Sequence, residues 1–141
     1  MNEEYRKFKN EDIEALVELM AQLGYEHTSD SLLKNVNSVR RVGGEIFVCD
    51  VAGTVCGCAS AILDVRLAAG VNGEIVSVVV SEQYRGKGLG KGLILHAESW
   101  LSERVFSIRI RANTVREDAH GFYKGMGYSL SKTQAVFEKN I

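Results

Sequence analysis

Apolar residues in the first third of the chain recur with helical spacing. From Ile13 to Leu23 they follow one another at intervals of three and four, which predicts an amphipathic helix that Asn10 caps and Gly24 ends. The same period over residues 30–42 predicts a second helix, capped by Ser29 or Asp30. A short strand, Tyr5–Phe8, is expected to precede both helices.

The middle of the chain has the pattern of strands instead. Glu45–Val51 and Thr54–Leu67 are predicted to form two strands joined by a tight turn at Ala52-Gly53. Residues 70–73 are expected to form a loop. Glu74–Val80 is rich in β-branched residues, which is typical of a strand covered on both faces.

The last third continues with both kinds of element. A glycine-punctuated turn leads into a helix ending near Leu101, and Phe106–Ala112 alternates apolar and charged residues like a strand. Glu117–Met126 is predicted to be helical and Tyr128–Asn140 to be a strand. The predicted order is β-α-α-β-β-β-α-β-α-β. The fold class is therefore α/β (α+β), with helices flanking a mixed, mostly antiparallel central sheet.

Composition narrows the possible partners. The 141 residues suit a single domain spanning 1–141, and a formal net charge of −1 gives no general electrostatic reason to bind nucleic acid or an anionic membrane. The polar start, Met1–Lys9, does not resemble a signal peptide, and no apolar run approaches the ~20 residues of a membrane span. Three cysteines without a zinc spacing are expected to be reduced thiols, so we expect a cytoplasmic protein with no bound metal.

The most informative segment follows the Val-rich strand and contains four glycines and three cations. Glycines leave main-chain N–H groups bare and free to adopt positive φ, and the helix that begins here adds its unpaired amides and positive dipole end. Such a turn favours binding of a diphosphate; the alternative is a glycine-rich connection with solvated lysines. The spacing fits neither the Walker pattern nor the dinucleotide fingerprint. The segment is Arg85-Gly86-Lys87-Gly88-Leu89-Gly90-Lys91-Gly92.

Arg85-x-x-Gly88-x-Gly90 resembles the Arg/Gln-x-x-Gly-x-Gly/Ala signature of the GNAT acetyltransferases, and the likeness extends from Tyr5 to Phe137. The resemblance implies a GNAT fold with acetyl-CoA as acetyl donor. It also implies that the fourth and fifth strands splay apart, so that the pantetheine arm pairs with the fourth. The residues it assigns to acetyl-CoA are Val78, Val79, Val80, Arg85, Gly86, Lys87, Gly88, Leu89, Gly90 and Lys91, with Asn113 and Arg116 near the second conserved segment.

Glu74 opens the Val-rich strand, eleven positions before Arg85. In several members of the family a glutamate at this spacing is the proposed general base, often acting through water. Strict alternation puts Glu74, Val76, Val78 and Val80 on one face, although a β-bulge, common in this strand of the family, would break the count. The alternative is a strand-end carboxylate in solvent.

Tyr123 lies in a second segment, residues 119–128, which resembles the family's Phe-Tyr-x-x-x-Gly-Phe/Tyr helix end. The matching tyrosine is commonly assigned as general acid for the leaving thiolate. Because Tyr123 also belongs to an i, i+3, i+4, i+7 stripe, the alternative is a core residue. Catalytic roles are thus predicted for Glu74 and Tyr123.

The acceptor is expected to be the primary amine of a small molecule. The segments around Glu74 and Tyr123, with Phe137-x-Lys139, look most like aminoalkylphosphonate N-acetyltransferases, which would favour an amine carrying an acid group. Arg40, Arg41 and Arg66 are the candidates to bind such a group. Alternatives are acetylation of a protein N-terminus or lysine, and a non-catalytic acyl-CoA sensor. The resemblance also implies a homodimer formed through the C-terminal strands.

Overall fold

The computed structural model describes residues 1–112 and 117–141. The chain divides into a larger unit, Met1–Ile110, and a smaller one, Arg111–Ile141. Each unit is described separately below.

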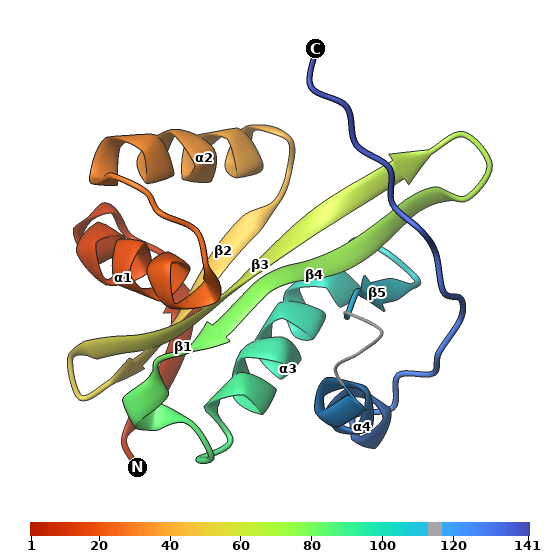
Figure 1. Ribbon diagram of the computed structural model, residues 1–141. Coiled ribbons are helices and arrows are strands. Elements are labelled where there is room, and N and C mark those ends of the chain that lie inside the picture. The colour runs from red at the N-terminus through yellow and green to blue at the C-terminus, as the bar shows by residue number, and fades with distance from the viewer. Residues whose placement is uncertain (113–116) are drawn as a thin grey trace. The chain divides into compact units, whose positions relative to one another are not determined.

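A five-stranded sheet forms the centre of the larger unit (Figure 1). The strands lie in the order β1-β2-β3-β4-β5, the same as their order along the chain. Neighbours from β1 to β4 are antiparallel and β5 runs parallel to β4, so the predicted mostly antiparallel sheet is confirmed. The strands are β1 (Glu3–Lys7), β2 (Glu45–Val51), β3 (Thr54–Arg66), β4 (Gly70–Val80) and β5 (Ile108–Ile110).

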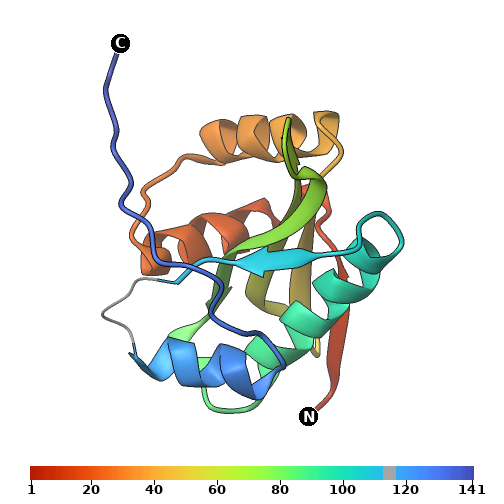
Figure 2. The ribbon, with the colours of Figure 1, turned by 90° about the vertical axis from the view of Figure 1, so that its right-hand side faces the viewer.

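Three helices cover the sheet in this unit. α1 (Ile13–Leu23) and α2 (Ser29–Arg41) pack on one face, and α3 (Leu89–Ser102) packs on the other (Figure 2). The apolar stripes predicted for the first two helices are buried against the sheet: Leu16, Leu19 and Val36 are each less than 5 % exposed. Burial of such side chains stabilises the unit by about 1.5–3 kcal/mol each relative to exposure.

The ends of α1 and α2 show why the helices begin and end where they do. Gly24, at φ +106°, is the left-handed residue that closes α1, as predicted. α2 begins one residue after Thr28, whose hydroxyl accepts a hydrogen bond from the Ser31 N–H at 3.1 Å. The cap is therefore Thr28 and not the predicted Ser29 or Asp30.

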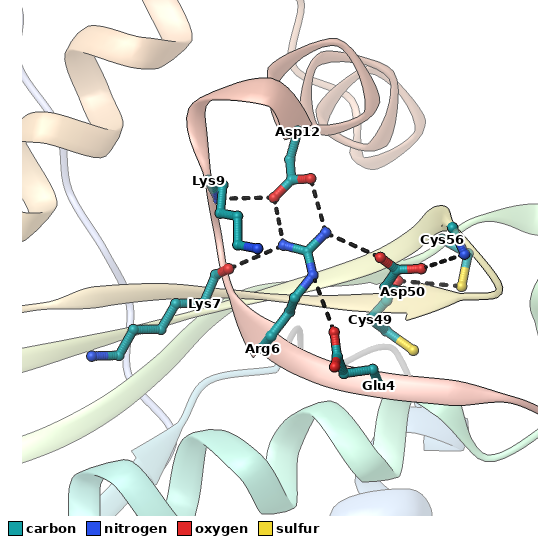
Figure 3. A network of polar contacts seen from close by, with 9 residues as sticks. Glu4, Arg6, Lys7, Lys9, Asp12, Cys49, Asp50 and Cys56 are labelled. Carbon is teal, nitrogen blue, oxygen red and sulfur yellow. Dashed lines mark hydrogen bonds and ion pairs between the residues drawn. The ribbon is translucent and has the colours of Figure 1, made fainter.

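A charged network joins the first strand to the first helix (Figure 3). The Arg6 guanidinium donates to both carboxylate oxygens of Asp12, at 2.8 and 3.0 Å, and to Asp50 on β2 at 3.1 Å. The Lys9 N–H also donates to Asp12, at 2.8 Å. Asp12 lies in the 3-10 turn η1 (Asn10–Asp12) and is only 6 % exposed. Its hydrogen bonds from Arg6 hold the pKa of the Asp12 carboxyl below its usual range.

Several predicted element boundaries are wrong in the larger unit. The first strand is Glu3–Lys7 and not Tyr5–Phe8, and the residue before α1 is Asp12 and not the predicted cap Asn10. Residues 70–73, expected to be a loop, belong to β4, because Val65 pairs with Val71 and extends the β3–β4 hairpin. β5 covers only Ile108–Ile110 of the predicted Phe106–Ala112. Long-range pairing sets strand length, and the local pattern does not reveal where pairing stops.

The smaller unit contains α4 (Glu117–Gly125). The helix ends in a turn in which Gly127 has φ +93° and the Tyr128 N–H donates to the Tyr123 carbonyl at 3.1 Å. The predicted strand Tyr128–Asn140 is wrong: residues 128–141 have no regular secondary structure. A strand needs a neighbour for its main-chain hydrogen bonds, and no partner strand pairs with this segment in the described ranges.

Candidate active site

A β-bulge interrupts β4 just beyond Glu74. Ser60 of β3 pairs with Val76 and Cys58 pairs with Val79, so Ser77 and Val78 together face Ala59. Ser77 takes φ +55°, a left-handed conformation uncommon for a residue with a side chain. The bulge therefore shifts the alternation of the strand by one residue.

The shift corrects the predicted side-chain directions. Val79 packs in the cluster beneath α1 and α2. Val80 lies on the α3 face, where its Cγ2 would be 3.7 Å from a Cβ added at Gly90 of α3. Val80 therefore does not share a face with Glu74 and Val76, and the simple count over the four even-numbered residues is wrong.

β4 and β5 pair only at one end. Their register runs from Gly73 opposite Ile108 to Ile75 opposite Ile110. From Val76 to Val80, β4 has no β5 partner in the described part of the chain. This edge includes Val78, Val79 and Val80, the residues expected to offer main-chain groups to a pantetheine arm.

The turn after β4 exposes main chain at the start of α3. Gly86 and Gly88 have φ +78° and +81°, and Gly88 is the residue immediately before the helix. The first α3 hydrogen bond recorded runs from the Gly92 N–H to the Gly88 carbonyl at 3.1 Å. The amides of the first helical turn therefore precede any intrahelical acceptor and are available to an anion.

The basic side chains of this turn make different contacts. The Arg85 Nε donates to the Val80 carbonyl at 2.9 Å, which ties the turn to the end of β4. The Lys87 ammonium lies 5.6 Å from the centre of the Tyr84 ring. Arg85, Lys87 and Lys91 are all exposed. Bare amides with nearby cations fit a diphosphate, so the predicted residues Arg85–Lys91 are brought together as a candidate CoA-binding turn.

Glu74 is buried where β4 meets β5, with only 7 % of its surface exposed. Its register partner on β5 is Arg109, whose Nη1 lies 3.7 Å from the Glu74 Oε1 and 3.0 Å from the Asp64 Oδ2. The interpretation of Glu74 as a solvated strand-end carboxylate is therefore wrong. The sequence pattern placed Arg109 on an outward face and missed this ion pair, which depends on the parallel register of two strands distant in sequence.

A cavity of about 420 Å³ lies between α1, α2 and the same face of the sheet. Ile62 lines it, and Ile62 is the β3 register partner of Glu74. Val76, two residues after Glu74 and on the same face, lines it as well. Glu74 is not itself a lining residue but lies beside two that are, and the bulge at Ser77 forms part of the cavity wall.

The arginines predicted to bind an acidic acceptor have other partners. The Arg40 Nε donates to Glu45 at 2.7 Å, and the Arg40 Nη2 donates to the Phe8 carbonyl at 2.6 Å. The Arg66 Nε donates to Asp64 at 2.8 Å. Neither arginine, nor Arg41, lines the cavity.

Tyr123 lies in the smaller unit, on α4. Its ring contacts those of Phe122 and Tyr128, with centroids 5.4 and 6.2 Å away, and it is half-buried. Its general-acid role stays a prediction. Asn113 and Arg116 lie outside the described residues.

Two further features, a metal site and a membrane-spanning helix, are not found among the described residues. No group of three or more His, Cys, Asp or Glu side chains there is arranged to hold a metal ion. No helix in those ranges has the length and apolar character needed to cross a membrane.

The chain is similar in sequence and fold to known acetyltransferases. A model of the acetyltransferase (GNAT) family matches residues 10–128. An uncharacterised N-acetyltransferase of Chlorobaculum tepidum is 36 % identical over 110 residues, which is 74 % of this chain and 63 % of that protein. The match thus spans less than two thirds of the length of this curated relative.

Solved structures agree over nearly the whole chain. An acetyltransferase of Trypanosoma brucei is 25 % identical with a TM-score of 0.84, covering 98 % of this chain and 100 % of that one. The Arabidopsis thaliana glucosamine-6-phosphate N-acetyltransferase, 21 % identical with a TM-score of 0.85, covers 99 and 100 %, and shares the fold. An aminoglycoside N-acetyltransferase in complex with CoA, 16 % identical with a TM-score of 0.86, covers 99 and 96 %. With its family match over residues 10–128 and this mixed α/β fold, the chain belongs to the GNAT acetyltransferase family.

Proposed function

We propose that this protein transfers the acetyl group of acetyl-CoA directly to the primary amine of a small molecule. The observation that carries the proposal is the position of Glu74, a buried carboxylate on β4, the strand that leads to the glycine-rich turn; its neighbours Ile62 and Val76 line a cavity. An aminoglycoside N-acetyltransferase of the same fold, solved in complex with CoA, supports the choice of donor.

Each group then has a task in the reaction. The main-chain amides of residues 86–91, helped by Arg85, Lys87 and Lys91, bind the diphosphate of the donor, and the open edge of β4 at Val78–Val80 binds its pantetheine arm. The donor supplies the acyl group. Glu74 takes the proton from the acceptor ammonium, directly or through water, so that the amine becomes nucleophilic. Tyr123 returns a proton to the leaving thiolate.

The acceptor itself occupies the cavity lined by Ile62 and Val76, the neighbours of Glu74. Its volume of about 420 Å³ lies near the small end of the usual range for small-molecule sites, roughly 300–1,000 Å³, which favours a small amine over a protein N-terminus or lysine. The aminoalkylphosphonate hypothesis draws its support from the sequence motifs alone. Buried Glu74 favours catalysis over an acyl-CoA sensor. Burial of a carboxylate is unfavourable, and a sensor does not require a buried carboxylate for proton transfer.

Two finer points belong to the same proposal. We expect a homodimer, on family resemblance, which a dimer mass by light scattering would support and a monomer mass would contradict. We also expect the reducing cytoplasm as its compartment, since Cys49, Cys56 and Cys58 are free and buried thiols.

Thiol release from acetyl-CoA, measured over a panel of amines, tests the activity. In Glu74→Gln, kcat should fall by about 10²–10⁴-fold, because the neutral amide cannot accept the proton. Tyr123→Phe should lower kcat with little change in acetyl-CoA affinity. The matched control is Glu82→Gln, which neutralises an exposed carboxylate soon after the same strand.

Thermal unfolding and acetyl-CoA titration separate chemistry from folding in these variants. The expected result is a lower kcat with the Tm and the acetyl-CoA Kd unchanged. An unaltered rate and pH profile in Glu74→Gln would remove the base from the proposal. A wild-type protein that binds acetyl-CoA but releases thiol with no amine of the panel would contradict the catalytic function.

A further inference from the structure

The cavity beside Glu74 has walls without a charged group. None of its lining residues is Asp, Glu, Lys or Arg. Its inner wall is apolar, with Leu16 and Met20 from α1, Val36 from α2 and Ile46 from β2. A ligand bound there loses water and finds mainly hydrocarbon, so a second charge on the ligand would be left without a partner.

The guanidinium of Arg40, on α2, has partners outside the cavity. Arg40, on α2, is held by Glu45 and by the Phe8 carbonyl, and its guanidinium lies 5.7 Å from the centre of the Phe8 ring. Breaking these contacts to reach a ligand would leave Glu45, which is 12 % exposed at its side chain, without this partner. An acceptor with a carboxylate or phosphonate therefore gains nothing from Arg40.

His27 is the polar lining residue whose orientation is best defined. Its Nδ1 lies 3.0 Å from the Ser31 Oγ in the first turn of α2. The same Oγ donates to the Thr28 carbonyl at 3.1 Å and accepts from the Thr28 N–H at 3.0 Å. The Ser31 Oγ therefore anchors the His27 ring to the capping box of α2 through Nδ1.

This contact fixes the orientation of the imidazole ring. Within residues 1–112 and 117–141 the other ring nitrogen, Nε2, makes no hydrogen bond. An imidazole nitrogen donates a hydrogen bond in one tautomer and accepts one in the other, and a ligand hydroxyl can match either. The capping box of α2 thereby makes His27 an oriented hydrogen-bonding group at the wall of an uncharged cavity.

We propose that the acceptor is a small primary amine whose remaining body is uncharged and mainly apolar, and that His27 selects a hydroxyl on that body. This inference rests on the proposed function, since the cavity is taken as the acceptor site. It names the acceptor class that the described residues favour over an amine with an acid group.

The test compares amines that differ by one group. Tyramine and tyrosine differ by a carboxylate, and tyramine and phenethylamine differ by the hydroxyl. 2-Aminoethylphosphonate carries an acid group, and spermidine carries two further cations. Thiol release from acetyl-CoA gives kcat/KM, and isothermal titration of each amine into the protein gives its Kd independently of turnover. We expect tyramine to exceed tyrosine, 2-aminoethylphosphonate and spermidine by at least about ten-fold in both measurements.

His27 is tested by two substitutions. His27→Phe keeps a ring but removes the hydrogen-bonding nitrogen, and should lower kcat/KM for tyramine roughly ten-fold while leaving phenethylamine within about two-fold. His27→Gln supplies an amide that can donate or accept and should restore part of the tyramine preference. A structural role for His27 alone would lower both amines equally, and that result would remove it from the proposal.

The outcomes separate the two proposals. Turnover with equal or better use of the acidic amines or spermidine would overturn the acceptor class and leave the acetyltransferase activity standing. Binding of tyramine, weakened by His27→Phe, without turnover of any amine would support the ligand class and contradict the activity. Absence of both binding and turnover across the panel would overturn both.

Discussion

The substitutions Gly88→Ala and Gly90→Ala each add one methyl group to the candidate CoA-binding turn, at positions two residues apart. Gly88 has φ +81° and ψ 6°, a left-handed conformation in which a side chain meets its own backbone. Gly90 lies inside α3, and its φ is not positive. We therefore expect Gly88→Ala and Gly90→Ala to act in opposite directions.

The structure sets the size of each effect. At Gly88 a new Cβ would meet nothing within 4 Å, so the cost is conformational strain alone, about 1–2 kcal/mol for an L-residue in this region. At Gly90 the new Cβ would lie 3.7 Å from the Val80 Cγ2, an ordinary contact on the side of the sheet. Alanine inside a helix is favoured over glycine by up to about 1 kcal/mol. The two variants should thus differ by about 2 kcal/mol.

Thermal unfolding and acetyl-CoA titration measure the two consequences. For a domain of this size about 1 kcal/mol corresponds to roughly 3–4 °C, so Gly90→Ala should unfold about 6–8 °C above Gly88→Ala. Where Gly88→Ala relieves its strain by rotating the chain, the amides turn away from the anion. The loss of one charge-assisted hydrogen bond then weakens acetyl-CoA binding by about ten-fold or more, whereas Gly90→Ala should stay within about three-fold.

Equal Tm values and equal affinities for the two variants would refute this reasoning, because they would show that the left-handed conformation of Gly88 is not required. A loss of affinity in Gly90→Ala as large as that in Gly88→Ala would show that the anion approaches along the helix and not over the turn.

Three further predictions concern stability and thiol chemistry. Because Arg6 lowers the pKa of folded Asp12, the pair should stabilise the fold above the unfolded pKa of about 3.9 and lose this as pH falls through the folded value; urea unfolding of Asp12→Asn should show a flatter acid dependence. Burial raises the pKa of the Cys49 and Cys58 thiols to about 12, so neither should react with a thiol reagent at pH 8 until the protein unfolds. At φ +55°, Ser77→Val should destabilise the protein by about 1–2 kcal/mol relative to Ser77→Gly, and equal stabilities would contradict the bulge.

The features that the sequence predicted best are those determined by residues close together in the chain. The turn at Ala52-Gly53 has φ +50° and +92°, as its two-residue hairpin pattern predicted, and the strand Glu45–Val51 has the predicted bounds. The glycine-rich turn before α3 was predictable for the same reason, and its binding of an anion stays a prediction. Glycine conformation, the start of a helix and nearby cations act within a few residues of one another, so the pattern itself contains the physical cause.

Tertiary structure decided every feature that depends on pairing between distant segments. The bulge at Ser77 arises from register against β3, and the Glu74–Arg109 contact from the parallel pairing of β4 with β5. Arg40 is one of the three arginines named from the sequence as candidates to bind an acidic acceptor, but folding brings it to Glu45 and the Phe8 carbonyl. A charged side chain pairs with the groups that the tertiary structure brings next to it. Local sequence therefore predicts neither the partners of Arg40 nor the absence of charged residues from the cavity lining.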